Sequence, residues 1–452
     1  MLPELLVAEI GSTTTVVNAF GGLTSSAPLF LGQGMAPTSA GRGDVNTGLI
    51  EAARDLEDRT GFKVSAIPLF ATSSAAGGLK MTVHGLVYDM TVKAAKEAAL
   101  GAGAVIRQIT AGELTGRDLR KLAAIKPNLI LLAGGVDYGE QRTVINNARR
   151  LGEFLAAQNL TVPVIYAGNV AAADEVAEIL SAFGLPVYPT ENVYPQIDLL
   201  NIEPTRRLIQ KAFEEHITQA PGMEKIRSLV QGPILPTPGA VMEAALLLSR
   251  EISDLMVVDV GGATTDVHSV TDGSEEYQKL LVNPEPRPKR TVEGDLGVYV
   301  NAGHVVELAG EELWKQRFGP DWPSLLKPVP STPEEIALTE ALAEIAVHTA
   351  VLRHCGRIRH LYGPTGRFAI AEGKDLTRVK AIIGTGGALT RLPGGKALLS
   401  RIPPLNRGQE LLPAKDTPVL IEADYIMASL GVLSRQHPEA ALTLLKKSLG
   451  LL

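Results

Sequence analysis

The stretch of sequence that determines the fold reads LMVVDVGGATTDVHSV, residues 255–270. Its first six residues are apolar except for Asp259, a pattern typical of a buried strand. Gly261 and Gly262 then permit a tight turn, and VHSV resumes the strand. The stretch therefore predicts a strand, a glycine turn and a second strand, with a carboxylate before the turn and hydroxyls on it.

The same pattern occurs near the N-terminus in LLVAEIGSTTTVV, residues 5–17. Here Glu9 precedes the turn, and Gly11, Ser12, Thr13 and Thr14 form it. The two copies lie about 250 residues apart. A third glycine loop, 384–387, ends the predicted strand VKAII at 379–383. A repeated strand–turn–strand unit predicts two related lobes.

These turns suit a phosphate ligand. Glycines let backbone N–H groups approach a phosphate without a Cβ in the way, and threonine hydroxyls add donors. A carboxylate at each turn could hold Mg²⁺ through water, because Mg²⁺ keeps much of its hydration shell. Two such turns facing each other would hold a polyphosphate from both sides. The third loop could cover an adenine and ribose close to a helix N-terminus.

The middle of the chain, 82–220, alternates predicted strands and helices, which indicates a small parallel sheet covered by helices. We expect four parts: 1–81 as the first part of lobe I, 82–220 as an inserted α/β module, 221–254 as the remainder of lobe I with a hinge helix, and 255–452 as lobe II. Glycines at 134–135 and 168 follow predicted strands of the module. They would meet a small ligand or a client protein, or serve only as turns.

Composition narrows the function classes. The 452 residues carry a net charge of −6, which gives no electrostatic reason to expect nucleic acid or an anionic membrane as a partner. The basic run at 287–290 is interpreted as a solvated loop. One cysteine, Cys355, excludes an intrachain disulfide and a cysteine-rich metal site. The N-terminus does not resemble a signal peptide, and no apolar run is long enough to span a bilayer, so we expect a cytoplasmic protein.

Three motifs resemble those of the actin, sugar-kinase and heat-shock chaperone superfamily: EIGSTTT and VDVGGATTD its two phosphate motifs, and IIGTGGALTRLP its adenosine motif. The resemblance implies an α/β fold with duplicated ribonuclease-H-like lobes, an actin-like ATPase. Two segments are similar to its paired hinge helices. In the first, Thr237 and Pro238 are expected to be the cap and the first helical residue. Small residues such as Ala240 and Gly431 would let the two helices cross closely.

The resemblance narrows to the MutL-type accessory proteins of glutamate mutase, which are unrelated to the mismatch-repair protein of that name. It rests on TSSAAGGLKM (72–81), NLILLAGGVDYG (128–139), PVIYAGN (163–169), KRTVEGDLG (289–297) and RHCGRI (353–358). It implies a reactivating factor for an adenosylcobalamin-dependent mutase or aminomutase, with ATP or ADP and Mg²⁺ as cofactors.

The resemblance also implies residue roles. Asp259 matches the carboxylate that positions Mg²⁺ or the attacking water, with Glu9 as the second metal-binding residue; Thr264 and Asp266 match positions near the γ-phosphate. The residues expected to contact the nucleotide are Gly11, Ser12, Thr13, Thr14, Gly261, Gly262, Thr265, Gly384, Gly386, Gly387, Arg353 and Arg357. The two arginines, near the end of a predicted long helix, would flank the adenine or form a solvated basic helix end. Glu9 departs from the superfamily, which normally has Asp there. Its extra methylene moves the carboxylate by more than about 1 Å, which puts the rate of hydrolysis in question.

The leading hypothesis is an ATP-dependent reactivating chaperone that exchanges damaged cobalamin out of its client mutase. The alternative is a small-molecule kinase of the same fold. An iron–sulfur activator of radical dehydratases would need two cysteines from each protomer, which disfavours that class here. An actin-like filament and a homodimer stay open.

Overall fold

The computed structural model describes residues 2–38, 45–65, 67–74, 79–101, 104–197, 199–217, 223–282, 285–363 and 366–452. The chain forms two compact units. Unit 1 comprises Met1–Ala76, Thr218–Val282 and Arg287–Leu452, and unit 2 comprises Gly77–Ile217 with Asn283–Pro286. Part of the TSSAAGGLKM motif, 75–78, lies outside the described residues.

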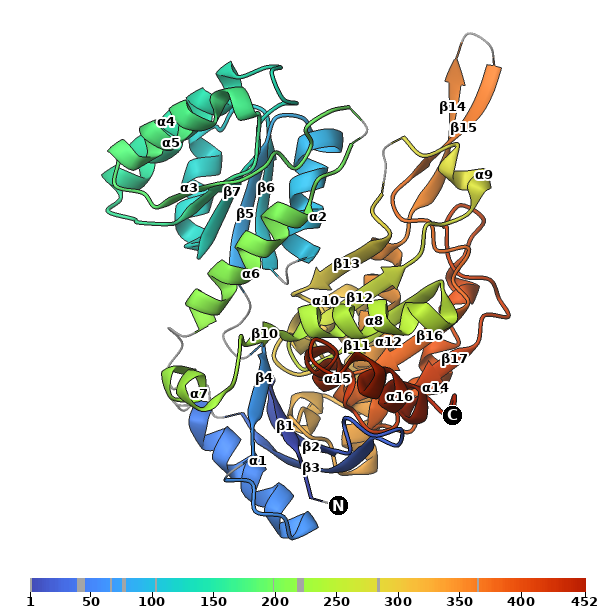
Figure 1. Cartoon of the computed structure of the whole chain (residues 1–452). Helices are drawn as coiled ribbons and strands as arrows, with labels where there is room; N and C mark the ends of the chain where they lie inside the picture. The colour runs from blue at the N-terminus through green and yellow to red at the C-terminus, as the bar shows by residue number, and fades with distance from the viewer. Residues whose placement is uncertain are drawn as a thin grey trace. The chain divides into compact units, whose positions relative to one another are not determined.

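Unit 1 contains two five-stranded sheets built to one plan (Figure 1). The sheet of lobe I has the order β10-β4-β1-β2-β3, and that of lobe II has the order β13-β12-β11-β16-β17. The strands of lobe I are β1 (Leu5–Ile10), β2 (Thr14–Gly21), β3 (Leu29–Pro37), β4 (Leu69–Ser73) and β10 (Leu235–Pro236). Those of lobe II are β11 (Leu255–Val260), β12 (Thr265–Val270), β13 (Pro288–Glu293), β16 (Ala381–Thr385) and β17 (Val419–Ile421).

In each sheet three antiparallel strands are followed by two parallel ones. The registers of the first hairpins also correspond: Glu9 lies opposite Val16, and Asp259 lies opposite Asp266. The predicted fold class, a two-lobed actin-like ATPase fold with duplicated lobes and an inserted α/β module, is confirmed.

The helices of unit 1 cover these sheets. They are α1 (Val45–Thr60), α7 (Met223–Leu229), α8 (Thr237–Ile252), α9 (Glu275–Gln278), α10 (Ala302–Ala309), α11 (Glu311–Phe318), α12 (Pro333–His354), α13 (Gly387–Thr390), α14 (Gly395–Leu399), α15 (Met427–Leu433) and α16 (Pro438–Ser448). Short 3₁₀ turns occur at Trp322–Leu325 and Pro403–Leu405. A two-stranded hairpin, β14 (Arg357–Gly363) with β15 (Gly366–Glu372), projects from lobe II (Figure 1).

Helices α8 and α15 lie side by side between the two sheets (Figure 1). A Cβ on Gly431 would lie 1.8 Å from the carbonyl oxygen of Ala240, so only glycine permits this close crossing. The helix start differs from the prediction: α8 begins at Thr237 itself, after Pro236, and Thr237 makes no capping hydrogen bond. Its hydroxyl instead accepts from the Thr72 hydroxyl at 3.0 Å.

The core around the crossing helices takes residues from both sheets, because Val7 of β1 and Val257 of β11 belong to one hydrophobic cluster with Ala244 and Leu430. A second cluster fills lobe II between its sheet and α12. Each lobe is thus packed onto the same pair of helices, which is the arrangement a hinge requires.

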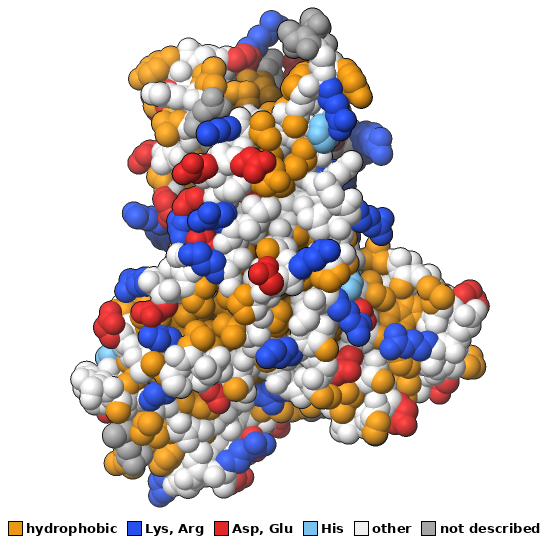
Figure 2. Space-filling model, turned by 90° about the vertical axis from the view of Figure 1, so that its right-hand side faces the viewer, with side chains coloured by type: hydrophobic (Ala, Val, Ile, Leu, Met, Phe, Trp, Pro, Cys, Tyr) orange, Lys and Arg blue, Asp and Glu red, His pale blue; other side chains and the backbone are white. Residues whose placement is uncertain are grey.

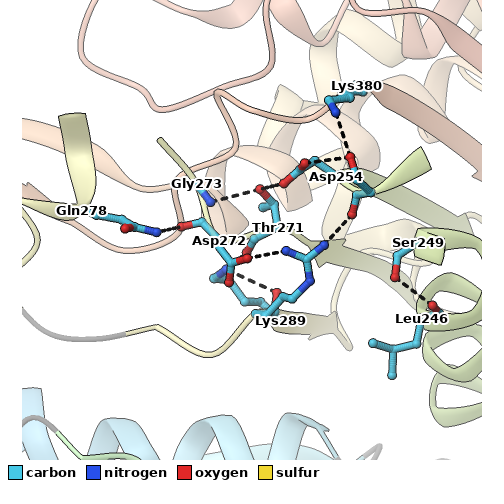
Figure 3. Close-up of polar contacts among 11 residues, drawn as sticks. Leu246, Ser249, Asp254, Thr271, Asp272, Gly273, Gln278, Lys289 and Lys380 are labelled. Carbon is cyan, nitrogen blue, oxygen red and sulfur yellow. Dashed lines mark hydrogen bonds and ion pairs between the residues drawn. The ribbon is translucent and has the colours of Figure 1, made fainter. Parts of the chain in front are cut away.

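Residues 287–290 correct the sequence interpretation. Three of them, 288–290, begin β13, and Lys289 and Arg290 are only 2% and 1% exposed; Arg287 precedes the strand and is partly exposed. Figure 3 shows the Lys289 ammonium among backbone carbonyls; it donates to the carbonyl of Thr271 at 2.5 Å. The prediction of a solvated loop is therefore wrong, because these carbonyls satisfy the ammonium inside the sheet.

On the face seen in Figure 2, basic and acidic side chains are interspersed.

Unit 2 is a parallel sheet with the order β6-β5-β7-β8-β9. Its strands are β5 (Leu79–Gly85), β6 (Ala104–Ala111), β7 (Leu129–Leu132), β8 (Val164–Tyr166) and β9 (Val187–Pro189). Its helices are α2 (Lys93–Gly101), α3 (Gly116–Ile125), α4 (Arg142–Ala157), α5 (Ala173–Ala182) and α6 (Glu203–Ile217), with a π-helical turn at Tyr88–Val92 and a 3₁₀ turn at Val170–Ala172. Its own hydrophobic core lies between the sheet and α3, α4 and α5.

Candidate functional site

The first glycine turn joins β1 to β2. The Gly11 amide donates to the Thr14 carbonyl at 2.9 Å, which closes the turn. A Cβ on Gly11 would lie 2.6 Å from that same oxygen, so the turn requires glycine. The Thr38 hydroxyl donates to the Gly11 carbonyl at 2.8 Å and holds the turn from the β3 side.

The second turn joins β11 to β12 in the same way. The Gly261 amide donates to the Thr264 carbonyl at 2.9 Å. The amides of Tyr299 and Val300 donate to the Gly262 carbonyl at 2.9 and 2.7 Å, which fixes the turn against the segment after β13. Both turns therefore present their backbone amides and hydroxyls from hairpins that hydrogen bonds hold in place.

The two turns face each other. A Cβ on Gly262 would lie 2.4 Å from the Thr13 hydroxyl, so a threonine of lobe I lies directly over a glycine of lobe II. Around them is a cavity of about 430 Å³. This volume lies within the range typical of small-molecule and cofactor sites.

Most of the predicted site residues line this cavity. They are Glu9, Gly11, Ser12, Thr13, Thr14, Asp259, Gly261, Gly262, Thr264, Asp266 and Gly387. The structure thus brings together residues from both hairpins and the first residue of α13. Their contacts with a nucleotide stay predictions.

Five predicted residues are not among those lining the cavity. Thr265 is fully buried and donates its hydroxyl to the Leu296 carbonyl at 2.6 Å. A Cβ on Gly384 would lie 2.7 Å from side-chain atoms of both Ile421 and Leu399, so this glycine packs against the core. Gly386 has φ +84°, and a Cβ there would lie 2.3 Å from an Asp259 carboxylate oxygen. Gly386 therefore permits close packing beneath the cavity.

The two arginines predicted to flank the adenine also lie elsewhere. Arg353 makes ion pairs with Glu293 at 2.7 Å and with Asp295 at 2.9 Å, which gives those two carboxylates a partner within lobe II. Arg357 is an exposed residue of β14, on the projecting hairpin. Neither arginine is among the residues that line the cavity.

Burial gives the site unusual electrostatics. Glu9 is 5% exposed, and burial together with the nearby negative charge of Asp259 raises its pKa to about 8. Desolvation raises the pKa of Asp259 to about 6. Burial and the Asp259 charge hold the pKa of Asp266 well above its usual range. Several carboxyl groups thus share a small space, which favours a bound cation or proton.

The donor set fits Mg²⁺ better than a fully protein-coordinated metal. Within the described ranges, no group of three or more histidine, cysteine, aspartate or glutamate side chains is arranged to hold a metal ion. Asp266 Oδ1 is buried, and no residue that the structure describes donates a hydrogen bond to it. Mg²⁺ typically takes one or two carboxylates and completes its shell with water and substrate phosphates. Glu9 and Asp259 would supply those two carboxylates, and Asp266 lies beside them on the cavity wall.

Sequence reasoning missed three residues near the carboxylates. Glu422 directly follows β17 and is fully buried. Its carboxylate accepts from the Thr385 hydroxyl at 2.6 Å, and burial raises its pKa to about 7. The Tyr425 hydroxyl donates to Glu9 at 2.9 Å. The Arg391 guanidinium lies 5.2 Å from the centre of the Tyr425 ring. A signal existed for Glu422, since a carboxylate after a strand parallel to β16 must lie at the same sheet edge as Gly384–Gly387.

Comparisons of the sequence with known proteins identify one family. The family model described as MutL protein matches residues 5–449. Protein MutL of Clostridium tetanomorphum is 37% identical over 426 residues, which cover 90% of this chain and 91% of that protein.

Similar solved structures are more distant. Nucleotide-free acetone carboxylase is 12% identical over 95% of this chain and 70% of that chain, with a TM-score of 0.43. A glycerol dehydratase reactivase is 12% identical over 95% of this chain and 99% of its own, with a TM-score of 0.36. A diol dehydratase-reactivating factor is 11% identical over 97% of this chain and 100% of its own, also with a TM-score of 0.36.

The family match spans nearly the whole chain, both hairpin turns and the inserted unit included, so the resemblance inferred from the motifs is confirmed and the chain belongs to the MutL protein family.

Proposed function

We propose that this chain is an ATP-driven reactivating factor that releases damaged cobalamin from an adenosylcobalamin-dependent mutase or aminomutase. The observation that carries the proposal is the pair of glycine turns that face each other across a cavity lined by buried carboxylates. A polyphosphate suits such a pair, because backbone amides and hydroxyls from both lobes would contact one ligand. The client class comes from the family resemblance.

In the proposed complex, the hydroxyls of Thr13, Thr14 and Thr264 donate to phosphate oxygens. Asp259 and Glu9 would hold Mg²⁺, which neutralises negative charge on the phosphates when bound. Asp266 would accept a hydrogen bond from the attacking water, since its Oδ1 has no donor among the described residues. Gly387, at the start of α13, would approach the nucleoside.

Hydrolysis would act on the client through the hinge. A switch needs two nucleotide states that differ in their affinity for the client. The close crossing of α8 and α15 at Ala240 and Gly431 supports a lobe rotation that keeps both helices packed.

We assign the client contact to unit 2. Large hydrophobic residues are exposed in the segments that follow the carboxyl ends of its strands. They are Val87 and Tyr88 after β5, Tyr138 after β7, Val170 after β8, and Ile197 after β9. Tyr138 is 81% exposed and has φ +60°, so a strained backbone holds an aromatic ring in solvent. Exposed apolar clusters of this kind mark protein contacts.

The glycines between these segments have a structural reason. A Cβ on Gly168 would lie 2.2 Å from the Gly134 amide nitrogen, so the loops after β7 and β8 pack backbone against backbone. Asn169 Oδ1 accepts from the Tyr138 amide at 2.9 Å. These contacts favour the interpretation of Gly134 and Gly168 as packing glycines that support the Tyr138 loop.

The direct test is reactivation. The protein is incubated with a cobalamin-inactivated mutase from the same genome, free adenosylcobalamin, Mg²⁺ and ATP, and mutase activity is followed. We expect activity to return with ATP but not without nucleotide. Tyr138→Ala should weaken client binding about 10-fold, within the range for interface aromatics, without altering ATP turnover.

Failure to restore any related mutase would remove support for the reactivation function. Transfer of the γ-phosphate to a small metabolite would instead identify the alternative, a kinase of the same fold. If Tyr138→Ala binds the client as well as the unaltered protein, the client surface lies elsewhere.

A further inference from the structure

Tyr425 lies in the segment that leaves lobe II after β17 and enters α15. Its φ of +54° is rare for a residue with a side chain, and such strain persists only where surrounding contacts impose it. Three contacts do so. The hydroxyl donates to Glu9 at 2.9 Å, the ring lies beneath the Arg391 guanidinium at 5.2 Å, and the backbone carbonyl accepts from the Gln33 amide at 3.3 Å.

These contacts join the two lobes. Gln33 belongs to β3 of lobe I, and Arg391 follows α13 of lobe II. An Arg391 N–H donates to the Gln33 side-chain oxygen at 2.5 Å. The Gln33 amide also donates to Asn18 Oδ1 at 2.7 Å. Asn18 is fully buried and donates to the Ser429 hydroxyl at 2.8 Å, which extends the network to the hinge helix α15.

The segment around Tyr425 is attached to lobe II at its other end. Glu422 accepts from the Thr385 hydroxyl at 2.6 Å and from the backbone amide of Ile426. Residues 422–426 therefore connect Thr385, in the third glycine loop, to Glu9, which precedes the first glycine turn. A rotation of one lobe against the other must change at least one of these contacts.

We propose that Tyr425 is a positioning residue that holds the Glu9 carboxylate and, through Arg391 and Gln33, makes the position of that carboxylate depend on lobe closure. The inference rests on the proposed nucleotide site and adds its regulation. The proposal also explains why position 9 is Glu rather than the Asp that is usual in the superfamily. Shortening Glu9 by one methylene would withdraw its carboxylate from the Tyr425 hydroxyl by more than about 1 Å, too far for the hydrogen bond.

The first measurement uses nucleotide-free protein. Hydrogen–deuterium exchange is compared for Tyr425→Phe, Arg391→Lys and the unaltered chain. We expect both variants to exchange faster in β3 and at the start of α15. Arg391→Lys keeps the charge but loses the planar contact with the ring. Tyr362→Phe, which removes a hydroxyl from a tyrosine 82% exposed on the hairpin, is the matched control and should leave exchange unchanged.

The second measurement is ATP turnover in two backgrounds. Tyr425→Phe should lower kcat about 10-fold, as loss of one hydrogen bond to a charged group gives, with KM for ATP nearly unchanged. In the Glu9→Asp background the same change should have almost no effect, because the hydroxyl has no carboxylate within reach. Equal effects in both backgrounds, or unchanged exchange in Tyr425→Phe, would overturn the proposal. A chain that turns over no ATP would contradict the proposed function, and the exchange measurement would still decide the role of Tyr425.

Discussion

The two hairpins of unit 1 share a backbone and differ in chemistry. Both turns close with an amide-to-carbonyl hydrogen bond of 2.9 Å, and both place a carboxylate one residue before the end of the first strand. Across from that carboxylate, lobe I has Val16 and lobe II has Asp266. A duplicated scaffold thus carries one acid in lobe I and a facing pair of acids in lobe II.

The surroundings of the two leading carboxylates differ as well. Glu9 is held from outside its own hairpin by the Tyr425 hydroxyl. Asp259 lies against the backbone of Gly386 in its own lobe. If the proposed ATPase function holds, we expect lobe II to carry most of the hydrolytic chemistry, and we expect the position of the lobe I carboxylate to depend on how the lobes are arranged.

The largest expected effect concerns the pH dependence of stability. The pKa of Glu9 rises on folding from 4.5 to about 8, and that of Asp259 rises from 3.8 to about 6. An acid with a raised folded-state pKa stabilises the fold below its unfolded pKa, and this contribution is lost as pH rises through the folded value. Relative to Glu9→Gln, the unaltered chain should therefore lose roughly 3–5 kcal/mol of unfolding free energy between about pH 4.5 and pH 8.

Asp259→Asn provides the comparison. The pH range over which Asp259 loses its stabilising contribution is narrower, from about pH 4 to pH 6. The expected loss of unfolding free energy is roughly half as large as for Glu9. Both are measured by urea unfolding across pH 4–9 without nucleotide or Mg²⁺. Stability curves that run parallel for the unaltered chain and Glu9→Gln would show that Glu9 is not buried as described.

The next effect concerns ATP turnover. Asp259→Ala should lower kcat about 100-fold, as the loss of one preorganised contact at a developing charge does. Glu9→Ala should cost about 10-fold, because Glu9 has no second acid across its hairpin. Asp58→Ala, at an exposed acid on α1, is the control and should be neutral. Equal losses of kcat for Asp259→Ala and Glu9→Ala would contradict the proposal that the hairpin of lobe II contributes more to catalysis than the hairpin of lobe I.

Local sequence predicted the parts of the site that lie on the hairpins. Glycine turns after apolar strands have few conformations available, so the hairpins themselves could be predicted from local sequence. The repetition of the turn and the resemblance of the motifs then predicted that Gly11 and Asp259 line one site, and both line the cavity. The duplicated sheets follow from the same repeat. The close helix crossing was predictable only through the family resemblance, because small residues such as Gly431 are also ordinary in the cores of proteins.

Residues whose role depends on distant partners were not predictable in this way. Arg353 was expected at the adenine, but Glu293 and Asp295 lie close enough to pair with it. Lys289 was expected in solvent, but the strand pairing of β13 places its ammonium beside the Thr271 carbonyl. Tyr425 reaches Glu9 only because the chain crosses from lobe II to α15 at that residue. Each of these contacts joins residues 18 or more positions apart, and a single sequence carries no trace of such pairing.

The smallest expected effect compares the glycines that open the two turns. A Cβ on Gly11 would lie 2.6 Å from the backbone oxygen of Thr14, whereas a Cβ on Gly261 would lie 3.4 Å from the corresponding oxygen of Thr264. Because a backbone oxygen closing a hydrogen-bonded turn cannot move freely, Gly11→Ala should destabilise the protein by about 1–2 kcal/mol. Gly261→Ala should change stability by less than about 0.5 kcal/mol. Both values come from urea unfolding at one pH, and each variant serves as the control for the other. If the two substitutions cost the same, the turns are more alike than their contacts indicate, and the difference between the lobes resides in the carboxylates alone.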